Sequence, residues 1–357
     1  VALKLGSRDI QPDQTLAVYV SDPMLHLALV MGLMLNGVRS VSAHPNYDAM
    51  PSTLPVDHYL CDRDLAHAGT TPVLQVDESW LNFGSHDRLF PKTRGFADPS
   101  AVARIFTSSG TTGVPKAMGH TTMGLSQLAM MRLSRDPSFM SGPTLSMMAL
   151  SSIGGFAAAF HALWAGIPLV MTTDIMQTLR AINLYQVHSL LASPVQVQGM
   201  VGMLKGRGAR FASLQRLIIG GAVLPAAVAL AARVLICQNI TNTYGATEIG
   251  GGACLATAAL LAAIPNAAGY PIPGCEMKLL NEAGEPVPVG SEGIVHLRTP
   301  VMVSGYIGDV QGTQECFRDG WFRPGDLGLI NDEGVLLITG RIGEMIKAAT
   351  QAQLPVS

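Results

Sequence analysis

A short loop rich in glycines and hydroxyl side chains is the clearest chemical feature of the chain. It runs from Ser108 to Lys116 and directly follows the apolar run from Val102 to Phe106. Glycines let backbone N–H groups approach an anion closely, hydroxyls add donors, and a lysine adds a positive point charge. The loop has the features of a phosphate cradle, with a spacing that differs from that of a Walker A loop. On composition alone, a solvated turn is the more common interpretation of such a run.

Four further segments follow this loop in a fixed order. They are Leu214 to Ala222, Asn242 to Glu248, Gly325 to Leu327 behind Trp321, and Gly340 to Lys347. Together with the loop, they resemble the motif set of the adenylate-forming superfamily, which includes acyl-CoA and aryl-CoA ligases, luciferases and the adenylation domains of peptide synthetases. The resemblance covers nearly the whole chain. It implies the large N-terminal core of an enzyme that activates a carboxylic acid with ATP as acyl-AMP and then forms a thioester with CoA.

The resemblance also implies how phosphates and metal are held. The loop from Ser108 to Lys116 would hold the β- and γ-phosphates, and Thr247 would offer a hydroxyl to the α-phosphate. Glu248 supplies a hard carboxylate oxygen for Mg²⁺, with Ser108 as a second hydroxyl on the metal side. The residues expected to take part in catalysis are Lys116, Thr247 and Glu248.

Adenine and ribose contacts follow from the later segments. By resemblance, Tyr244 offers a flat face to adenine, and Asp326 has enough lone pairs to accept both ribose hydroxyls. Arg341 adds a donor for the sugar or the phosphates. Without the resemblance, Tyr244 and Glu248 would be ordinary strand-end residues on a turn. The expected ATP-binding set is Ser108, Ser109, Gly110, Thr111, Thr112, Gly113, Lys116, Gly220, Gly221, Ala222, Asn242, Tyr244, Gly245, Thr247, Asp326 and Arg341.

Small residues mark the expected place of the acid, because they leave room beside the α-phosphate. By resemblance the acyl pocket is formed by Ser151, Ser152, Gly154, Phe156, Gly220, Ala246 and Gly250. Relatives that activate amino acids carry an Asp in the first of these segments, and none stands between Leu145 and Met171. Many acyl-CoA and aryl-CoA ligases carry a histidine where this chain has Ser152, so the class of acid stays open. His161 lies at a helix-like position and is interpreted as a core histidine.

Other functions stay open beside the leading one. A fatty acyl-AMP ligase would pass its adenylate to the thiol of a carrier protein, and an amino-acid adenylation domain is disfavoured by the missing Asp. From a different class, the chain could be a module that binds ATP and an acyl-adenylate without turnover. The expected ligands are therefore a small carboxylic acid, ATP, Mg²⁺ and CoA, with a carrier protein as the other acceptor.

Composition limits the class of protein further. The formal net charge of −2 gives no basic footprint, so nucleic acid is not an expected partner. The run from Leu145 to Met171 carries no Asp, Glu, Lys or Arg and is long enough to span a bilayer. Because Ser151 to Gly155 and Gly166 to Pro168 divide it, we interpret it as a buried βαβ unit and expect no transmembrane segment. Five widely spaced cysteines without a C-x-x-C pair, and a start without a signal-peptide pattern, favour a cytoplasmic protein.

The order of apolar runs predicts the fold. From Thr15 to about Thr243, strand-like and helix-like runs alternate, which predicts an α/β fold with doubly wound, mostly parallel sheets and helices on both faces. In such sheets ligands lie at the carboxyl ends of the strands, where the cradle loop and the segment from Asn242 to Glu248 both fall. From Gly269, prolines and glycines separate short alternating runs, which predicts a small antiparallel β subdomain.

Three regions are therefore expected along the chain. They are an α/β core of two sheet subdomains with a clipped N-terminus over 1–268, the β subdomain over 269–340, and a hinge segment with a tail over 341–357. Glu344 occupies the hinge position. Relatives continue beyond the hinge into a mobile lid that carries a catalytic lysine. We expect that lid to be absent here, so that the chain is an incomplete enzyme.

Overall fold

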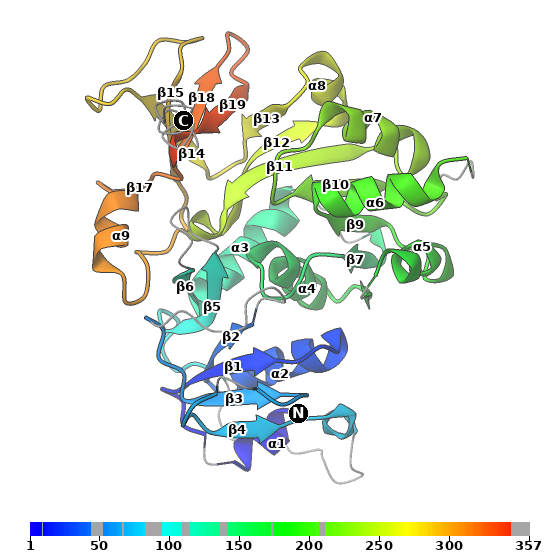
Figure 1. Cartoon of the computed structure of the whole chain (residues 1–357), viewed down its shortest axis with the longest axis vertical. Coiled ribbons are helices and arrows are strands. Elements are labelled where there is room, and N and C mark those ends of the chain that lie inside the picture. The colour runs from blue at the N-terminus through cyan, green and yellow to red at the C-terminus, as the bar shows by residue number, and fades with distance from the viewer. Residues whose placement is uncertain are drawn as a thin grey trace, which may run out of the picture.

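Two sheets form the frame of the protein. The computed structural model describes residues 1–8, 10–43, 53–65, 68–82, 95–108, 115–135, 141–172, 174–206 and 211–343. Within these residues one sheet has six strands and the other has thirteen (Figure 1). In the described part of the chain, no helix has both the length and the apolar character needed to cross a membrane.

The six-stranded sheet is built from the N-terminal third of the chain. Across the sheet the strands are β4 (Val73–Gln75), β3 (His58–Cys61), β1 (Thr15–Tyr19), β2 (Arg39–Ser42), β5 (Val102–Ser108) and β6 (Lys116–Thr121). The first five run parallel, and β6 returns antiparallel to β5. Helix α2 (Pro23–Leu35) packs on β1 and β2, and α1 (Ala2–Gly6) and the 3-10 helix η1 (Glu78–Leu81) pack on α2. The Asp22 side chain caps α2 by accepting from the Leu25 N–H at 2.7 Å.

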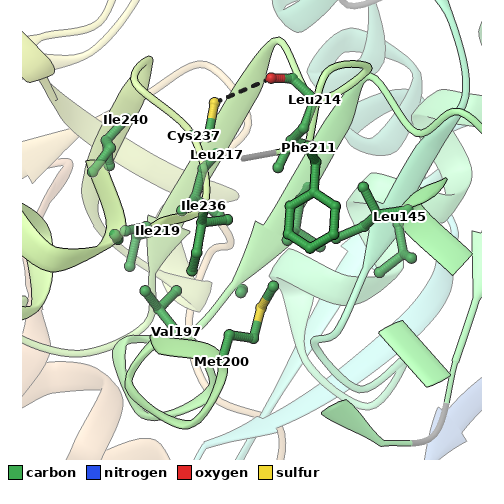
Figure 2. Close-up of a cluster of buried hydrophobic side chains, with 14 of the residues drawn as sticks. Leu145, Val197, Met200, Phe211, Leu214, Leu217, Ile219, Ile236, Cys237 and Ile240 are labelled. Carbon is green, nitrogen blue, oxygen red and sulfur yellow. Dashed lines mark hydrogen bonds between the residues drawn. The ribbon is translucent and has the colours of Figure 1, made fainter. Parts of the chain in front are cut away.

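The larger sheet begins with parallel strands. These are β8 (Leu169–Met171), β7 (Thr144–Ser146), β9 (Ser189–Ala192), β10 (Arg216–Gly220) and β11 (Ile240–Ala246). Helices α5 (Ile175–Leu184), α6 (Pro194–Leu204) and α7 (Ala226–Leu235) accompany them. Figure 2 shows the core beneath these helices, where Val197 and Met200 of α6 face Ile219 of β10. Ile236, which follows α7, belongs to the same cluster. Burial of this apolar cluster fixes the helices on the sheet.

Antiparallel strands extend the larger sheet. They are β12 (Gly251–Thr257), β13 (Ala267–Pro271), β19 (Leu336–Arg341), β18 (Asp326–Ile330), β15 (Gly293–Arg298), β17 (Trp321–Phe322) and β16 (Phe317–Arg318), and β14 (Glu276–Leu280) pairs with β15. Short helices η3 (Thr247–Ile249), α8 (Ala258–Ala263) and α9 (Val310–Cys316) lie between them. The expected boundary at residue 268 falls inside β13, and the division into three regions stays a prediction.

Helices α3 (Thr122–Arg135) and α4 (Ile153–Ala165) lie between the two sheets (Figure 1). Helix α4 packs on β7 and β8, while its residues Ile153 and Phe156 also join the core of the six-stranded sheet. Strands β7 and β8 are parallel neighbours, so the charge-free run from Leu145 to Met171 forms the predicted βαβ unit. The predicted α/β fold with a C-terminal antiparallel region is confirmed.

A fully buried arginine joins the first sheet to the start of α4. Arg104 on β5 donates to the Ser40 hydroxyl at 3.1 Å, to the Ser42 hydroxyl, and to the Leu150 carbonyl at 3.1 Å. Burial lowers the pKa of the Arg104 guanidinium to about 9, so the group remains charged at neutral pH. All three acceptors are neutral, and the charge is therefore stabilised by hydrogen bonds rather than by an ion pair.

Aromatic rings complete the surroundings of this cation. The Arg104 guanidinium lies 5.2 Å from the ring centroid of Phe106 and 5.3 Å from that of Phe156. These are cation–π distances, and the two rings are 5.5 Å apart. The same group thus connects β2, β5, the loop before α4 and α4 itself.

Replacement of Arg104 by alanine is expected to be strongly destabilising. Arg104→Ala leaves the buried Ser40 and Ser42 hydroxyls and the Leu150 carbonyl without their donor and opens a cavity between two aromatic rings. We expect the free energy of unfolding to fall by about 3 kcal/mol or more, measured by urea denaturation. The exposed Arg63 is the matched control, because Arg63→Ala should change stability by no more than about 0.5 kcal/mol. Similar small effects of both variants would contradict this role of Arg104.

Candidate functional site

One cavity collects most of the predicted site residues. Its volume is about 760 Å³, and it is lined by the ends of β5 and β6, one face each of α3 and α4, strands β10 to β12, and residues 306, 323, 324 and 341. The predicted site residues that line it are Ser108, Lys116, Ser151, Ser152, Gly154, Gly220, Gly221, Gly245, Ala246, Thr247, Glu248, Gly250 and Arg341. Motifs that are far apart in sequence therefore meet at one cavity.

The ends of the predicted phosphate loop are fixed by strand pairing. Ser108 at the end of β5 lies directly opposite Lys116 at the start of β6. Ser109, Gly110, Thr111, Thr112 and Gly113, which belong to the same prediction, lie outside the described residues. The Lys116 ammonium is 4.5 Å from the centroid of the Tyr306 ring. A positive charge is thereby held at the cavity wall beside an aromatic face.

Glu248 is a buried carboxylate in the wall of the cavity. It is 7% exposed, and its Oε1 accepts a hydrogen bond of 2.9 Å from the Tyr306 hydroxyl. Burial raises the pKa of Glu248, while hydrogen bonds from its own backbone and from Tyr306, together with the charge of Lys116, oppose that increase. A bound cation would favour the ionised form of such a group.

A buried histidine holds the backbone beside Glu248. His120 Nε2 is 3.1 Å from the Thr247 carbonyl oxygen, and the His120 ring stands edge-on to Phe106 with centroids 5.4 Å apart. Burial lowers the pKa of His120 to about 4, so the ring is neutral at physiological pH. A carbonyl can only accept, so Nε2 carries the proton. The contact fixes Thr247 relative to β6.

Asp326 is the centre of a second hydrogen-bonded group. Its Oδ2 accepts from the Tyr244 hydroxyl at 2.7 Å, and its Oδ1 accepts from the Arg341 Nε at 2.7 Å. Asp326 is 4% exposed, whereas the Arg341 side chain is 51% exposed. Burial and the neighbouring Asp326 charge raise the pKa of Tyr244, so its hydroxyl stays protonated as a donor. Tyr244 and Asp326 do not themselves line the cavity, but Arg341 brings this group to its wall.

Two glycines are required by the geometry of the wall. A side chain at Gly245 would place its Cβ 1.8 Å from the Gly251 carbonyl oxygen, where β11 and β12 approach closely at a bulge. Gly221 has a φ of 88°, which side-chain-bearing residues rarely adopt. The small residues of these segments therefore reflect backbone geometry as well as room for a ligand.

The two serines before α4 have different surroundings. Ser152 caps the helix by accepting from the Gly155 N–H at 3.1 Å, which gives this residue a structural reason to be serine. Ser151 is 3% exposed, and its hydroxyl has no partner among the described residues. The residue nevertheless belongs to the lining of the cavity.

Some predicted residues lie elsewhere. Phe156 is fully buried in the core against Phe106 and Phe160 and does not line the cavity. Asn242 donates to the Ala267 carbonyl at 3.3 Å and, like Ala222, is not part of the lining. Glu344, the expected hinge residue, lies outside the described residues.

Several lining residues were not predicted from the sequence. Tyr306 belongs to none of the five motifs, and nothing in its local sequence marks it as the partner of Glu248. On α3, Leu128, Met131, Arg132 and Arg135 line the cavity, and their spacing of three, four and seven residues from the first is that of one helical face. His161 lies on α4, is buried as expected of a core histidine, and nevertheless lines the cavity. The helical periodicity of the α3 residues is the sequence signal from which their common face could have been predicted.

The lining suits an anionic ligand and a metal ion that arrives with it. Among the described residues its charged side chains are Glu248 and the cations Lys116, Arg132, Arg135, Arg216, Arg323 and Arg341. No group of three or more metal-ligating residues is found in the described part of the chain. One carboxylate with a nearby hydroxyl is nevertheless the usual protein share of a Mg²⁺ site, because phosphates and water supply the other ligands. ATP with Mg²⁺ therefore fits this donor set.

Two curated relatives are named as ligases of carboxylic acids. 4-Coumarate–CoA ligase-like 6 from Oryza sativa subsp. japonica is 28% identical over 282 residues, which are 72% of this chain and 47% of that protein. Fatty acid–(acyl-carrier-protein) ligase ScoC from Streptomyces coeruleorubidus is 28% identical over 295 residues, which are 79% of this chain and 56% of that protein. The chain thus spans about half the length of these curated relatives.

The fold is shared with solved structures. O-succinylbenzoate coenzyme A synthetase from Bacillus subtilis, in complex with ATP and magnesium ion, superposes with a TM-score of 0.82 at 19% identity, over 100% of this chain and 73% of that one. The same synthetase in complex with its acyl-adenylate intermediate also gives a TM-score of 0.82. The family model of the AMP-binding enzymes matches residues 1–307. The chain therefore belongs to the family of AMP-binding enzymes.

Proposed function

We propose that this protein activates a carboxylic acid with ATP as acyl-AMP, as a step toward a thioester with CoA. The observation that supports this most directly is the meeting of Lys116, Glu248 and Arg341 at one cavity, with Asp326, which does not line it, hydrogen-bonded to Arg341, since these groups match the charges of a nucleotide. Family membership and the CoA ligases among the relatives agree with it. The acceptor could also be a carrier protein, as the name of the Streptomyces relative indicates for that enzyme.

The nucleoside end is assigned to Asp326 and its partners. Each carboxylate oxygen of Asp326 already accepts one hydrogen bond and retains a lone pair for a ribose hydroxyl. Because Tyr244 and Arg341 fix both oxygens, the carboxylate is oriented before the nucleotide binds. Such preorganisation reduces the entropy lost on binding.

The phosphate end is assigned to the opposite wall. Lys116 would offset the charge of the outer phosphates, and Ser108 lies beside it at the end of the paired strand. Glu248 and Ser108 would be the protein ligands of Mg²⁺, which when bound neutralises phosphate charge. Tyr306 donates to one oxygen of Glu248, Oε1, and so helps to orient the carboxylate.

In the reaction, a carboxylate oxygen of the acid forms a bond to the α-phosphorus of ATP, and the bond to pyrophosphate breaks. Negative charge develops on the non-bridging oxygens of the α-phosphate. The Thr247 hydroxyl, positioned by the bond from His120 to the Thr247 carbonyl, would donate to one of these oxygens. Lys116 would stabilise the charge that passes to the leaving pyrophosphate.

The acid is proposed to be a fatty or aryl acid rather than an amino acid. Among the described lining residues, Glu248 is the only carboxylate, and it is assigned to the metal, so no partner for a substrate ammonium is found there. We further propose that the protein acts in the cytoplasm, in keeping with its five free cysteines.

Stable acyl-adenylate analogues provide the test of acid class. We expect acyl sulfamates of adenosine that carry a fatty or aryl acyl group to bind more tightly than AMP in calorimetry, because they contact both ends of the cavity. An alanyl analogue should gain nothing over AMP. Preference for the alanyl analogue would contradict the proposed acid class, and failure of AMP, ATP and all analogues to bind would contradict the proposed function.

Two substitutions should separate the nucleoside end from the phosphate end. Asp326→Ala should weaken ATP and AMP alike by about 1.5–3 kcal/mol, because both carry the ribose. Lys116→Ala should weaken ATP and leave AMP nearly unchanged, since AMP lacks the outer phosphates. Calorimetry with both nucleotides measures this.

Matched controls exist for both variants. Lys278 stacks on Trp321 at 4.3 Å, much as Lys116 stacks on Tyr306, but lies outside the cavity lining. Lys278→Ala and Asp332→Ala should therefore leave nucleotide affinity unchanged. An equal loss of AMP affinity in Lys116→Ala would remove this lysine from the outer phosphates.

Glu248→Gln should stabilise the ligand-free protein at neutral pH. The pKa of Glu248 is raised in the folded state, so the folded state holds this proton more tightly than the unfolded chain does. The contribution of Glu248 to stability is therefore present at low pH and falls as the pH rises above the usual glutamate range. In Glu248→Gln this decrease should be absent, and the ligand-free variant should be at least as stable as the parent at neutral pH in urea denaturation.

The same variant should lose the metal dependence of ATP binding. We expect Mg²⁺ to tighten ATP binding to the parent much more than to Glu248→Gln, measured by titration at several Mg²⁺ concentrations. Tyr306→Phe is the control, because it keeps the carboxylate and removes only its hydrogen-bond donor. Identical Mg²⁺ responses of parent and Glu248→Gln would exclude Glu248 as the metal ligand.

A further inference from the structure

Tyr306 lies where the later antiparallel region meets β6. Its own backbone forms a bridge to β6, and the N–H of Ile307 donates to the Ala117 carbonyl at 2.8 Å. The Tyr306 N–H donates to the Thr313 hydroxyl at 2.9 Å. Because β6 begins at Lys116, these bonds fix the backbone of Tyr306 relative to the strand that carries the lysine.

The Tyr306 side chain contacts two groups of opposite charge. The Lys116 ammonium lies 4.5 Å from the ring centroid, and the hydroxyl donates to Glu248 Oε1 at 2.9 Å. An edge-on contact with Phe317, with ring centroids 5.3 Å apart, packs the ring. Tyr306 is 9% exposed and lines the cavity, as do Lys116 and Glu248. A single buried side chain therefore holds both charged groups at the cavity wall.

Lys116 and Glu248 form no ion pair with each other in the described part of the chain. The ammonium is instead held by the Tyr306 ring and lies 3.9 Å from the Cys316 sulfur, while the carboxylate is held by the Tyr306 hydroxyl. Opposite charges in a partly buried site attract each other more strongly than in water. A direct ion pair would satisfy both groups and leave neither for a nucleotide.

We propose that Tyr306 is a positioning residue that keeps Lys116 and Glu248 apart in the ligand-free protein, its ring holding the ammonium for the outer phosphates and its hydroxyl holding the carboxylate for Mg²⁺. This inference rests on the proposed function, which assigns those roles to the two charged residues. A lysine side chain has many rotamers, so an ammonium that is already held by a ring loses less entropy when ATP binds.

The ring contact is tested with ATP in the absence of Mg²⁺, when Glu248 has no metal to bind. We expect Tyr306→Leu to weaken metal-free ATP binding about tenfold in calorimetry and AMP binding less than about twofold, because only ATP carries outer phosphates. In a Lys116→Ala background the same substitution should change ATP affinity by less than about twofold. A loss that is equal for ATP and AMP, or that persists without the lysine, would show a packing role and overturn the inference.

The hydroxyl contact is tested with Tyr306→Phe, which keeps the ring. This variant should bind metal-free ATP within about twofold of the parent, because Lys116 retains its aromatic face. Mg²⁺ should still tighten ATP binding to it, since Glu248 is present, but half-maximal tightening should require at least about threefold more Mg²⁺. An unchanged Mg²⁺ midpoint would overturn the inference, and this measurement decides it if Tyr306→Leu does not fold.

The separation of the two charges has its own test. In Tyr306→Leu we expect Lys116 to pair with Glu248, and Glu248→Gln removes that partner. Glu248→Gln should therefore tighten metal-free ATP binding at least about fivefold more in the Tyr306→Leu background than in the parent. Equal gains in the two backgrounds would show that Tyr306 does not keep the charges apart and would overturn the inference.

Trp321 provides a matched control, because its ring holds the Lys278 ammonium at 4.3 Å outside the cavity lining. Trp321→Leu should leave the affinity for metal-free ATP unchanged. If the parent binds ATP and AMP and the Tyr306 variants behave as the parent does, the proposed function stands and the inference is wrong. If the parent binds neither nucleotide, the proposed function fails, and the inference fails with it.

Discussion

A buried positive charge that has no carboxylate partner in the described part of the chain constrains the centre of this fold. Among the described residues, Arg104 is stabilised by neutral oxygens and two aromatic rings, while its Nε has no hydrogen-bond partner, so its surroundings must be dry and fixed. Those surroundings come from both halves of the α/β region, since Ser40 lies in the first sheet and Leu150 in the loop before α4. The position of α4 relative to the first sheet follows, and with it the cavity wall formed by Ser151 and Gly154.

Two phenol–carboxylate hydrogen bonds near the cavity likewise connect separate parts of the fold. Tyr306, which follows β15, donates to Glu248 of η3, and Tyr244 of β11 donates to Asp326 of β18. In each pair one partner comes from the segment around β11 and the other from the later antiparallel region. The carboxylates assigned to metal and ribose thus also connect these two parts of the larger sheet. The affinity for a nucleotide that contacts both carboxylates would therefore depend on how these two parts are placed relative to each other.

The sequence predicted the elements whose signal is local. Alternating apolar runs located most parallel strands and helices, and the segment from Leu145 to Met171 was correctly divided because its small residues mark turns. Antiparallel strands such as β6 and β12 were not predicted, because Lys116 to Thr121 and Gly251 to Thr257 lack clear alternation. Their pairing depends on neighbours supplied by the fold, as for Gly245 against Gly251.

The site shows the same division between local and long-range information. Motif residues such as Lys116 and Glu248 were found because their segments have a recognisable order. Tyr306 was missed because its role depends on a contact across 58 positions of the chain. Phe156 was placed in the acyl pocket although its ring faces the core, since the face of a helical residue depends on what packs against each side. His161 was interpreted as a core residue, and the structure buries it at 2% exposure.

Some of the buried polar atoms beside the cavity are unsatisfied. Among the described residues, the buried side chains without a hydrogen-bond partner include Ser151, Thr243 and His161, and all three line the cavity. A protein interior normally pairs such groups, because an unpaired buried donor or acceptor loses its hydration without compensation. Their positions run from the start of α4, along β11, to the far end of α4. Residues with unpaired hydroxyls, Ser151 and Thr243, thus stand beside apolar ones such as Leu128, so the wall of the cavity is of mixed polarity.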